Sequence, residues 1–379
     1  GDAKANVLNG GAGDDVLIGG LGNDNLIGGD GSDTASFIDA TKPITASLAS
    51  GRATGQGTDV FSSIENLTGG SGKDVLTGDA STNRIDGGVG DDKLFGGAGD
   101  DALVGGLGND TLNGGDGSDV ADFSALSTAV RANLATGKAS SAAGNDVLVA
   151  IENLNGGNAA DQLIGNDSAN VISGLGGNDN ISGAGGDDTL LGGNGNDVLI
   201  GGDGVDTVNY AVVTGAMSVS LGAGTASGQG ADTLNGIENV LTGTGNDTLI
   251  GDGNGNVLDG GQGNDIILGK AGADSLIGGQ GNDRLDGGDG VDLVDGGIGR
   301  NICEADATVG EAQSNCSFTI AFDVNSARFV TGTIATADGV ATAGVAILFV
   351  SSGVTVTSDS RGAFVGVTQA GSQQILIDY

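Results

Sequence analysis

The chain has 379 residues, of which 79 are Gly, and its 49 Asp and Glu against 13 Lys and Arg give a formal net charge of −36. With no His, no Trp and only 3% aromatic residues, it lacks the groups for His-based catalysis and for a conventional side-chain core. The charge disfavours nucleic acid and anionic membranes as partners, and no apolar stretch is long enough for a transmembrane helix, so we expect neither nucleic-acid binding nor membrane insertion.

From its N-terminus the chain is built of nine-residue repeats. Residues 10–18 read GGAGDDVLI and residues 19–27 read GGLGNDNLI, so the unit is G-G-x-G-x-D-x-U-x, with U a large aliphatic residue. A glycine-rich acidic chain could instead be disordered. The regular recurrence of hydrophobic residues, 37% of the chain, argues against disorder. The chain begins inside a repeat, as a processed protein or a fragment would.

Each nonapeptide divides into a six-residue turn and a three-residue strand. The strand points its central aliphatic residue inward, so the repeats predict a column of buried side chains. If two nonapeptides make one coil, residues 18 apart stack on the same edge. The inward residues are then Leu17, Leu26, Leu94, Leu103, Leu112, Leu190, Leu199, Ile267, Leu276 and Leu285.

The turns have the composition of a calcium site. Glycines allow positive φ and bring carbonyl oxygens inward, and the Asp at the sixth position adds a carboxylate. Calcium binds six to eight such oxygens, and an ion between stacked turns would cancel the repulsion between their carboxylates. The expected stacks are Asp15 on Asp33, Asp92 on Asp110, Asp101 on Asp119, Asp179 on Asp197, Asp188 on Asp206, Asp265 on Asp283 and Asp274 on Asp292. The complete set of candidate ligands adds Asp24, Asp74, Asp161 and Asp247.

A longer period of about 86 residues carries the nonapeptides. The sequence Ile64–Leu67 (IENL) returns at 151–154 and, as IENV, at 237–240. Three supramodules therefore follow one another, each with a glycine-poorer insert near 37–68, 123–155 and 210–241. Alternating stretches such as 44–48 and 217–221 predict half-buried strands, and we expect the inserts to continue the solenoid as wider coils.

The sixth turn position is Asn instead of Asp near the start of each run. This occurs at Asn6, Asn83, Asn170 and Asn256, where the turns also lack the full glycine set. An amide is a neutral oxygen donor, so these sites should bind calcium more weakly or form metal-free Asn stacks. They are not among the candidate ligands.

About twenty nonapeptides in register strongly resemble the haemolysin-type, or RTX (repeats-in-toxin), family over residues 1–304. The resemblance implies an all-β fold, a parallel β-roll or β-solenoid with Ca²⁺ as its cofactor, which we place at residues 1–302. It also implies secretion in a calcium-poor unfolded state, commonly by type I export, and folding outside the cell. An extracellular or cell-surface location follows from it.

Two cysteines, Cys303 and Cys316, flank a short acidic loop at residues 303–316. In a secreted chain they most simply form one disulfide that closes the solenoid end. The alternatives are a reactive thiol, which lacks a His or basic neighbour, and a zinc site, which lacks enough soft ligands.

In residues 317–379 glycine thins out and β-branched residues alternate, which predicts a small β-sandwich. The expected strands are 318–322, 329–334, 345–350, 354–357, 363–368 and 374–377. The pattern around residues 332–345 and 358–364 resembles the carboxypeptidase-regulatory or transthyretin-like β-sandwich. An unrelated capping sandwich is the alternative.

Two functions fit these features, and neither is enzymatic, because the repeat already accounts for the acidic residues. In the first, the chain is a calcium-dependent structural or adhesive module that forms a rod, surface layer or filament. It could polymerise through the solenoid ends or the C-terminal sandwich. In the second, it is the C-terminal export and folding appendage of a secreted hydrolase or toxin. Three supramodules favour the first, because an export appendage needs fewer repeats.

Overall fold

The computed structural model describes residues 1–306 and 312–316 and, within 317–379, the backbone of six strands. The described residues form strands and turns and no helix. None of them belongs to a helix long and apolar enough to span a membrane. By its contacts the chain divides into two compact units, Gly1–Asp206 and Thr207–Tyr379. The domain boundaries at 302 and 316 are still predictions.

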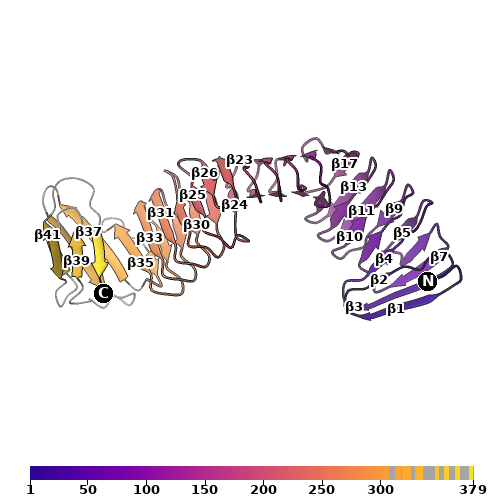
Figure 1. Cartoon of the computed structure of the whole chain (residues 1–379), viewed down its shortest axis with the longest axis horizontal. Helices are drawn as coiled ribbons and strands as arrows, with labels where there is room; N and C mark the ends of the chain where they lie inside the picture. Colours follow the sequence, from indigo (N-terminus) through magenta and orange to yellow (C-terminus); the bar gives the residue numbers. More distant parts are fainter. Residues whose placement is uncertain are drawn as a thin grey trace. The chain divides into compact units, whose positions relative to one another are not determined.

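In each unit, short strands stack in two sheets as the chain coils (Figure 1). Sheet A of the first unit contains β1 (Val7–Ala12), β3 (Asn25–Asp30), β5 (Thr45–Ser47), β6 (Arg52–Thr54), β7 (Thr58–Ser62), β9 (Val75–Thr77), β11 (Lys93–Ala98), β13 (Thr111–Asp116), β15 (Arg131–Asn133), β16 (Lys138–Ser140), β17 (Asn145–Val149), β19 (Gln162–Ile164), β21 (Asn180–Gly185) and β23 (Val198–Asp203). Sheet B contains β2 (Val16–Leu17), β4 (Thr34–Ser36), β8 (Asn66–Thr68), β10 (Arg84–Asp86), β12 (Ala102–Val104), β14 (Val120–Asp122), β18 (Asn153–Asn155), β20 (Val171–Ser173) and β22 (Thr189–Leu191).

The second unit repeats this arrangement. Its sheet A contains β25 (Ser218–Ser220), β26 (Thr225–Ser227), β27 (Ala231–Asn235), β29 (Thr248–Ile250), β31 (Ile266–Ala271), β33 (Arg284–Asp289), β35 (Ile302–Asp306), β37 (Phe318–Asn325), β38 (Phe329–Ala335) and β41 (Ala363–Val367). Its sheet B contains β24 (Thr207–Asn209), β28 (Asn239–Leu241), β30 (Val257–Asp259), β32 (Ser275–Ile277), β34 (Leu293–Asp295) and β36 (Ala312–Ser314). A third sheet has the order β40 (Val354–Thr357), β39 (Ala346–Phe349), β42 (Ile375–Asp378).

The coil is two nonapeptides long, as predicted. Regular strands pair in parallel with partners 18 residues away: Leu94 of β11 pairs with Leu112 of β13 in sheet A. In sheet B, Ile85 of β10 pairs with Leu103 of β12 in the same way. In most of the regular three-residue strands the central residue is buried, and all ten predicted inward residues belong to this core. One aliphatic side chain per strand makes a narrow core, so the turns must supply much of the coil-to-coil cohesion.

The inserts continue the solenoid, as expected, because β4 pairs in parallel with β8 across the first insert, but the longer coil contains a meander that was not predicted. In the first insert, β5, β6 and β7 form an antiparallel meander, which gives sheet A the local order β3-β7-β6-β5-β9. The chain reverses at Gly51, whose φ of 65° favours glycine. Gly137 and Gly224 have φ of 63° and 67° at the matching turns of the other inserts. The predicted half-buried strands are present as β5 and β25.

The C-terminal strands lie close to the predicted positions. The six strands β37 to β42 match the six expected ranges to within a few residues at their ends. They fall in two groups, β37-β38-β41 and β40-β39-β42, and all pairings within each group are antiparallel. Strand β37 also pairs in parallel with β35, so this segment extends sheet A.

Candidate calcium-binding turns

Glycine is favoured at three positions of a regular turn, each for a structural reason, as the turn 105–110 illustrates. Gly106 and Gly108, at the second and fourth positions, have φ of 93° and 142°, which other residues rarely adopt. Gly105, at the first position, has an ordinary φ. A Cβ there would lie only 2.6 Å from Oδ2 of Asp110. The repeat therefore folds its sixth residue back over its first.

The sixth-position aspartates form hydrogen-bonded ladders between coils. Asp92 donates its backbone N–H to Oδ1 of Asp110 at 2.8 Å, and the same bond joins the other six predicted stacks at 2.8 to 2.9 Å. The stacking predicted from the 18-residue spacing is thus confirmed. The turns before sheet A hold Asp24, Asp74, Asp92, Asp110, Asp161, Asp179, Asp197, Asp247, Asp265 and Asp283. The turns before sheet B hold Asp15, Asp33, Asp101, Asp119, Asp188, Asp206, Asp274 and Asp292.

The second carboxylate oxygen is the exceptional feature of these turns. In most of them Oδ2 is buried and has no hydrogen-bond partner, although a buried polar atom without a partner costs about 1 to 3 kcal/mol. A cation bound in the turn would be such a partner. The aspartates concerned include Asp15, Asp24, Asp33, Asp92, Asp101, Asp110, Asp119, Asp179, Asp188, Asp247, Asp265, Asp274, Asp283 and Asp292.

The titration of these carboxyl groups reflects the same burial. Burial, reinforced by neighbouring aspartates, raises the pKa of Asp92, Asp179 and Asp265 to about 7. For the same reasons the pKa of Asp101 and Asp188 rises to about 6. A nearby cation would favour the charged form and reverse these shifts.

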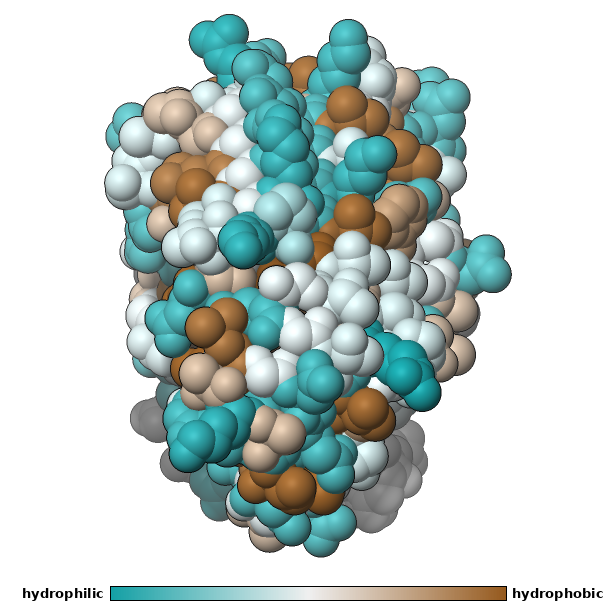
Figure 2. All heavy atoms as spheres, turned by 90° about the vertical axis from the view of Figure 1, so that its right-hand side faces the viewer, coloured by the Kyte–Doolittle hydropathy of each residue, from teal (hydrophilic) through white to brown (hydrophobic). Residues whose placement is uncertain are grey.

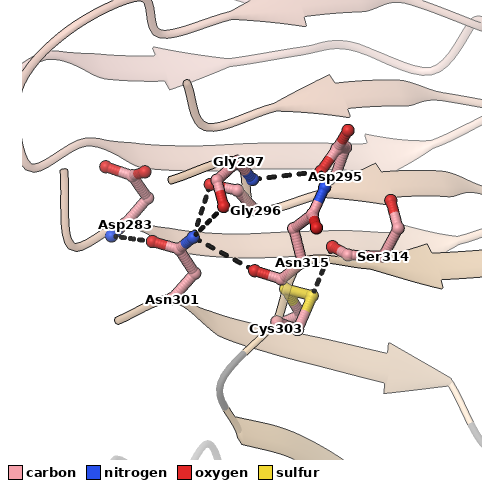
Figure 3. The surroundings of a disulfide bond; sticks show 9 residues. Asp283, Asp295, Gly296, Gly297, Asn301, Cys303, Ser314 and Asn315 are labelled. Carbon is pink, nitrogen blue, oxygen red and sulfur yellow. Dashed lines mark hydrogen bonds between the residues drawn. A yellow bond between two sulfur atoms is a disulfide. The ribbon is translucent and has the colours of Figure 1, made fainter. Parts of the chain in front are cut away.

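Carbonyl oxygens would supply the other ligands. Among the described residues, no three carboxylate or cysteine side chains gather as a metal-binding cluster. The turn of Asn301, the last of its column, shows what surrounds the sixth side chain (Figure 3). Its Oδ1 accepts the N–H of Asp283 at 3.0 Å, as an aspartate would, whereas its Nδ2 donates to the carbonyls of Gly296 at 2.6 Å and Asn315 at 3.1 Å. Carbonyl oxygens thus surround this position, and with an aspartate present the donor set fits calcium.

Replacing Asn301 by Asp should therefore create a further calcium-dependent turn. The variant loses the amide donor and gains a carboxylate oxygen beside those carbonyls, which costs about 1 to 3 kcal/mol without a cation. Because an added ion would stabilise the folded state by mass action, the melting temperature should rise more steeply with calcium concentration than in the wild type. Scanning calorimetry at several calcium concentrations measures this slope. Equal slopes for the variant and the wild type would show that the carbonyls around residue 301 do not form a calcium site.

Two candidate ligands, Asp74 and Asp161, differ from the others. Oδ2 of Asp74 accepts the backbone N–H of Gly70 at 2.7 Å, and Oδ2 of Asp161 accepts that of Gly157 at 2.6 Å. Both side chains therefore have a protein partner for each oxygen. This difference between aspartates could not be read from the repeat pattern.

At the three internal Asn positions, the side-chain amide donates a hydrogen bond at the place where an aspartate turn would hold a cation. Asn83 donates from Nδ2 to the carbonyl of Glu65 at 2.8 Å, and its Oδ1 accepts the N–H of Asp79. Asn170 and Asn256 donate in the same way to the carbonyls of Glu152 and Glu238. The metal-free Asn stack is the alternative that agrees with this geometry. At Asn6, Oδ1 accepts the N–H of Asp2.

Sequence reasoning missed the carboxylates by which the inserts continue the ladders. Asp24 donates its N–H to Oδ1 of Asp59, and Asp33 donates to Oε2 of Glu65, both at 2.8 Å. In the second module Asp146 and Glu152 have these roles. The signal was present, because Asp59, Asp146 and Asp232, like the three IEN glutamates, recur at the supramodule period.

A second ladder, at the fifth turn position, was also missed. Here the side chain of one coil accepts the backbone N–H of the next coil, as when Oδ1 of Asn264 accepts from Asn282 at 2.8 Å. Oδ1 of Asn246 and of Asn178 accept from the next coil in the same way. The frequent Asn and Asp at this position are its sequence signal. These bonds join the coils without a metal.

The predicted disulfide joins Cys303 and Cys316, with their Cα atoms 5.8 Å apart (Figure 3). Both residues are buried, and Cys303 pairs with Leu285, so the disulfide continues the aliphatic core at the solenoid end. Replacing both cysteines by Ser should lower the stability of the second unit by about 3 kcal/mol. Thermal unfolding in calcium measures the loss, and reduction of the wild type should reproduce it. An unchanged melting temperature would show that the bond is dispensable.

Comparison with protein families matches the RTX calcium-binding nonapeptide repeat at residues 1–35, 59–94, 87–121, 155–190, 182–211, 232–267, 241–276 and 268–303. Comparison with curated proteins found no match. The family matches cover more than half of the chain and contain the regular turns described above. The chain therefore belongs to the RTX calcium-binding nonapeptide repeat family.

Proposed function

We propose that this chain is an extracellular structural or adhesive module that calcium folds and stiffens after secretion. The observation that carries the proposal is the row of buried Oδ2 atoms without partners along both edges of the coil. Calcium bound between stacked turns supplies the missing partner and neutralises the acidic columns. The side chains of this chain fix the positions of the turns, through the Oδ1 ladders and the aliphatic core.

The expected affinities suit such a switch. Extracellular calcium modules have dissociation constants of about 0.1 to 1 mM. At about 1 mM free calcium, a site with a dissociation constant of about 0.1 mM contributes roughly 1.4 kcal/mol. In a calcium-poor compartment this contribution is absent, so we expect the chain to stay unfolded until it is exported. The buried disulfide fits an oxidising compartment outside the cell.

A structural role accounts for the residues better than catalysis does. The chain contains no His, and most of its buried aspartates already belong to the turn ladders. On the face shown in Figure 2, hydrophobic residues lie in small separate groups among hydrophilic ones. Three supramodules also provide more repeats than an export appendage needs. We therefore infer a non-enzymatic structural or adhesive module that can polymerise.

Assembly in solution tests this role. The full chain is examined by sedimentation velocity and negative-stain electron microscopy in 5 mM calcium, in 5 mM magnesium and in chelator. Filaments, sheets or higher oligomers in calcium alone support the structural module. Folded monomers at every protein concentration would contradict it and favour the export appendage.

A further inference from the structure

Each of the first two inserts contains a short loop that imitates the second half of a calcium turn. The loops are residues 56–59 (QGTD) and 143–146 (AGND), and each corresponds to positions three to six of the nonapeptide. The first of the two glycines that open a regular turn is absent from both loops, and the second is present only in the first loop, as Gly55. We call these loops the half-turns.

The first half-turn packs on the regular turn 19–24 with the contacts of one regular turn on another. Gly22 donates its N–H to the carbonyl of Gln56 at 3.0 Å, just as Gly90 donates to Leu107 at 2.7 Å in a regular pair. Thr58 donates its N–H to Oδ1 of Asn23 at 2.8 Å, which continues the fifth-position ladder.

The approach of the backbones is equally close. A Cβ on Gly57 would overlap the carbonyl oxygen of Gly22, as a Cβ on Gly108 would overlap that of Gly90. Asp24 then donates its N–H to Oδ1 of Asp59 at 2.8 Å. The half-turn therefore places a carboxylate where the next regular turn would place one.

The second half-turn repeats every one of these contacts. Gly108 donates to the carbonyl of Ala143 at 2.9 Å, and Asn145 donates to Oδ1 of Asn109 at 3.0 Å. Asp110 donates to Oδ1 of Asp146 at 2.9 Å. The arrangement is thus built into the supramodule and occurs at equivalent places in two inserts.

An oxygen without a partner is buried beside each half-turn. Oδ2 of Asp24 and Oδ2 of Asp110 have no hydrogen-bond partner, and these residues are 2% and 1% exposed. Asp59 and Asp146 are themselves buried, at 2% and 7% exposure. Two neighbouring carboxylates that are both buried repel each other when charged, so a cation or a proton has to neutralise the pair.

We propose that each half-turn completes a calcium site with the regular turn before it, one between Asp24 and Asp59 and the other between Asp110 and Asp146. The carbonyls of each turn supply the neutral oxygens. The inference rests on the proposed calcium binding by the regular turns. It adds two sites in inserts whose sequence lacks the G-G-x-G-x-D pattern, and Asp146 lies outside the residues matched to the family.

The third insert supplies its own donor to the corresponding carboxylate. Tyr210 stands where Phe37 and Phe123 stand in the first two inserts, and its hydroxyl donates to Oδ2 of Asp232 at 2.8 Å. In this insert the Tyr210 hydroxyl thus supplies a hydrogen-bond partner to the carboxylate, which Phe37 and Phe123 cannot do. The proposal is therefore confined to the first two inserts.

Calcium stoichiometry tests the proposal. Asp59→Asn and Asp146→Asn keep an oxygen that can accept the N–H of the preceding turn, but they remove the negative charge. Equilibrium dialysis with radioactive calcium at saturation should find one ion fewer in each variant and two fewer in the double variant. The matched control, Asp39→Asn, changes the same charge at an exposed residue and should retain every ion.

The outcomes separate this proposal from the proposed function. An unchanged ion count in both variants overturns the half-turn sites while the regular turns still bind calcium. A wild type that binds no calcium would overturn the proposed function itself. Circular dichroism in calcium checks that each variant folds. Independently of any variant, crystals of the wild type grown with terbium should show anomalous peaks between Asp24 and Asp59 and between Asp110 and Asp146, and their absence beside occupied regular turns would count against the sites.

Discussion

Gly281→Ala is expected to destabilise the second unit by about 3 to 5 kcal/mol. Gly281 has φ of 145°, a conformation that side chains rarely adopt, and its added Cβ would overlap the carbonyl oxygen of Gly263 in the preceding coil. Since that overlap is with backbone, the coils must separate. Separation would also break the turn-to-turn ladder between Asp265 and Asp283. Calcium affinity and thermal stability should fall together.

The matched control is Gly253→Ala, in a turn of the same unit. Gly253 has no positive φ, and a Cβ there would meet nothing within 4 Å. We expect a change of less than about 0.5 kcal/mol at this exposed position. Thermal unfolding at fixed calcium compares the two variants. Equal losses would mean that close coil stacking does not require glycine at the fourth turn position.

Acidification should promote folding of the calcium-free chain. Burial raises the folded-state pKa of Asp92, Asp179 and Asp265 to about 7, above the value of roughly 3.9 in an unfolded chain. A raised folded pKa stabilises the fold fully below the unfolded pKa, and this contribution is lost as pH rises through about 6 to 7. Between pH 8 and pH 5, the dialysed calcium-free chain should therefore gain β structure.

Circular dichroism of the dialysed chain at pH 8, 6.5 and 5 measures this effect. The further gain produced by added calcium should be largest at pH 8, where the carboxylates are charged, and smallest at pH 5. Loss of β signal on acidification without calcium would show that the buried carboxyl groups do not control folding. Sodium chloride at matched ionic strength controls for general screening of the net charge of −36.

The regular part of the fold could be predicted because its sequence signals are local and repeated. The nonapeptide gives the turn, the inward residues such as Leu94 and Leu112, and the 18-residue stack of Asp92 on Asp110. The disulfide and the C-terminal strands also followed from local patterns. Each of these features depends on residues close in sequence or on a strict period.

The remaining features depend on which backbone groups happen to lie nearby. Asp74 has a backbone partner for Oδ2, whereas Asp92 has none, although both occupy the sixth turn position. The meander in each insert and the half-turn ending at Asp59 lack the paired glycines that identify a turn. The role of Asn83 becomes clear only from its contact with Glu65, because the backbone carbonyl of Glu65 accepts a hydrogen bond from the side-chain amide of Asn83.

The central claim is that calcium folds the solenoid, and a calcium titration followed by far-UV circular dichroism tests it most directly. The purified full chain is dialysed free of calcium at pH 8 and titrated with calcium, with magnesium as the control ion. A cooperative gain of β signal with calcium and not with magnesium is the predicted result. Full β structure in calcium-free buffer at pH 8, unchanged by added calcium, would contradict the account.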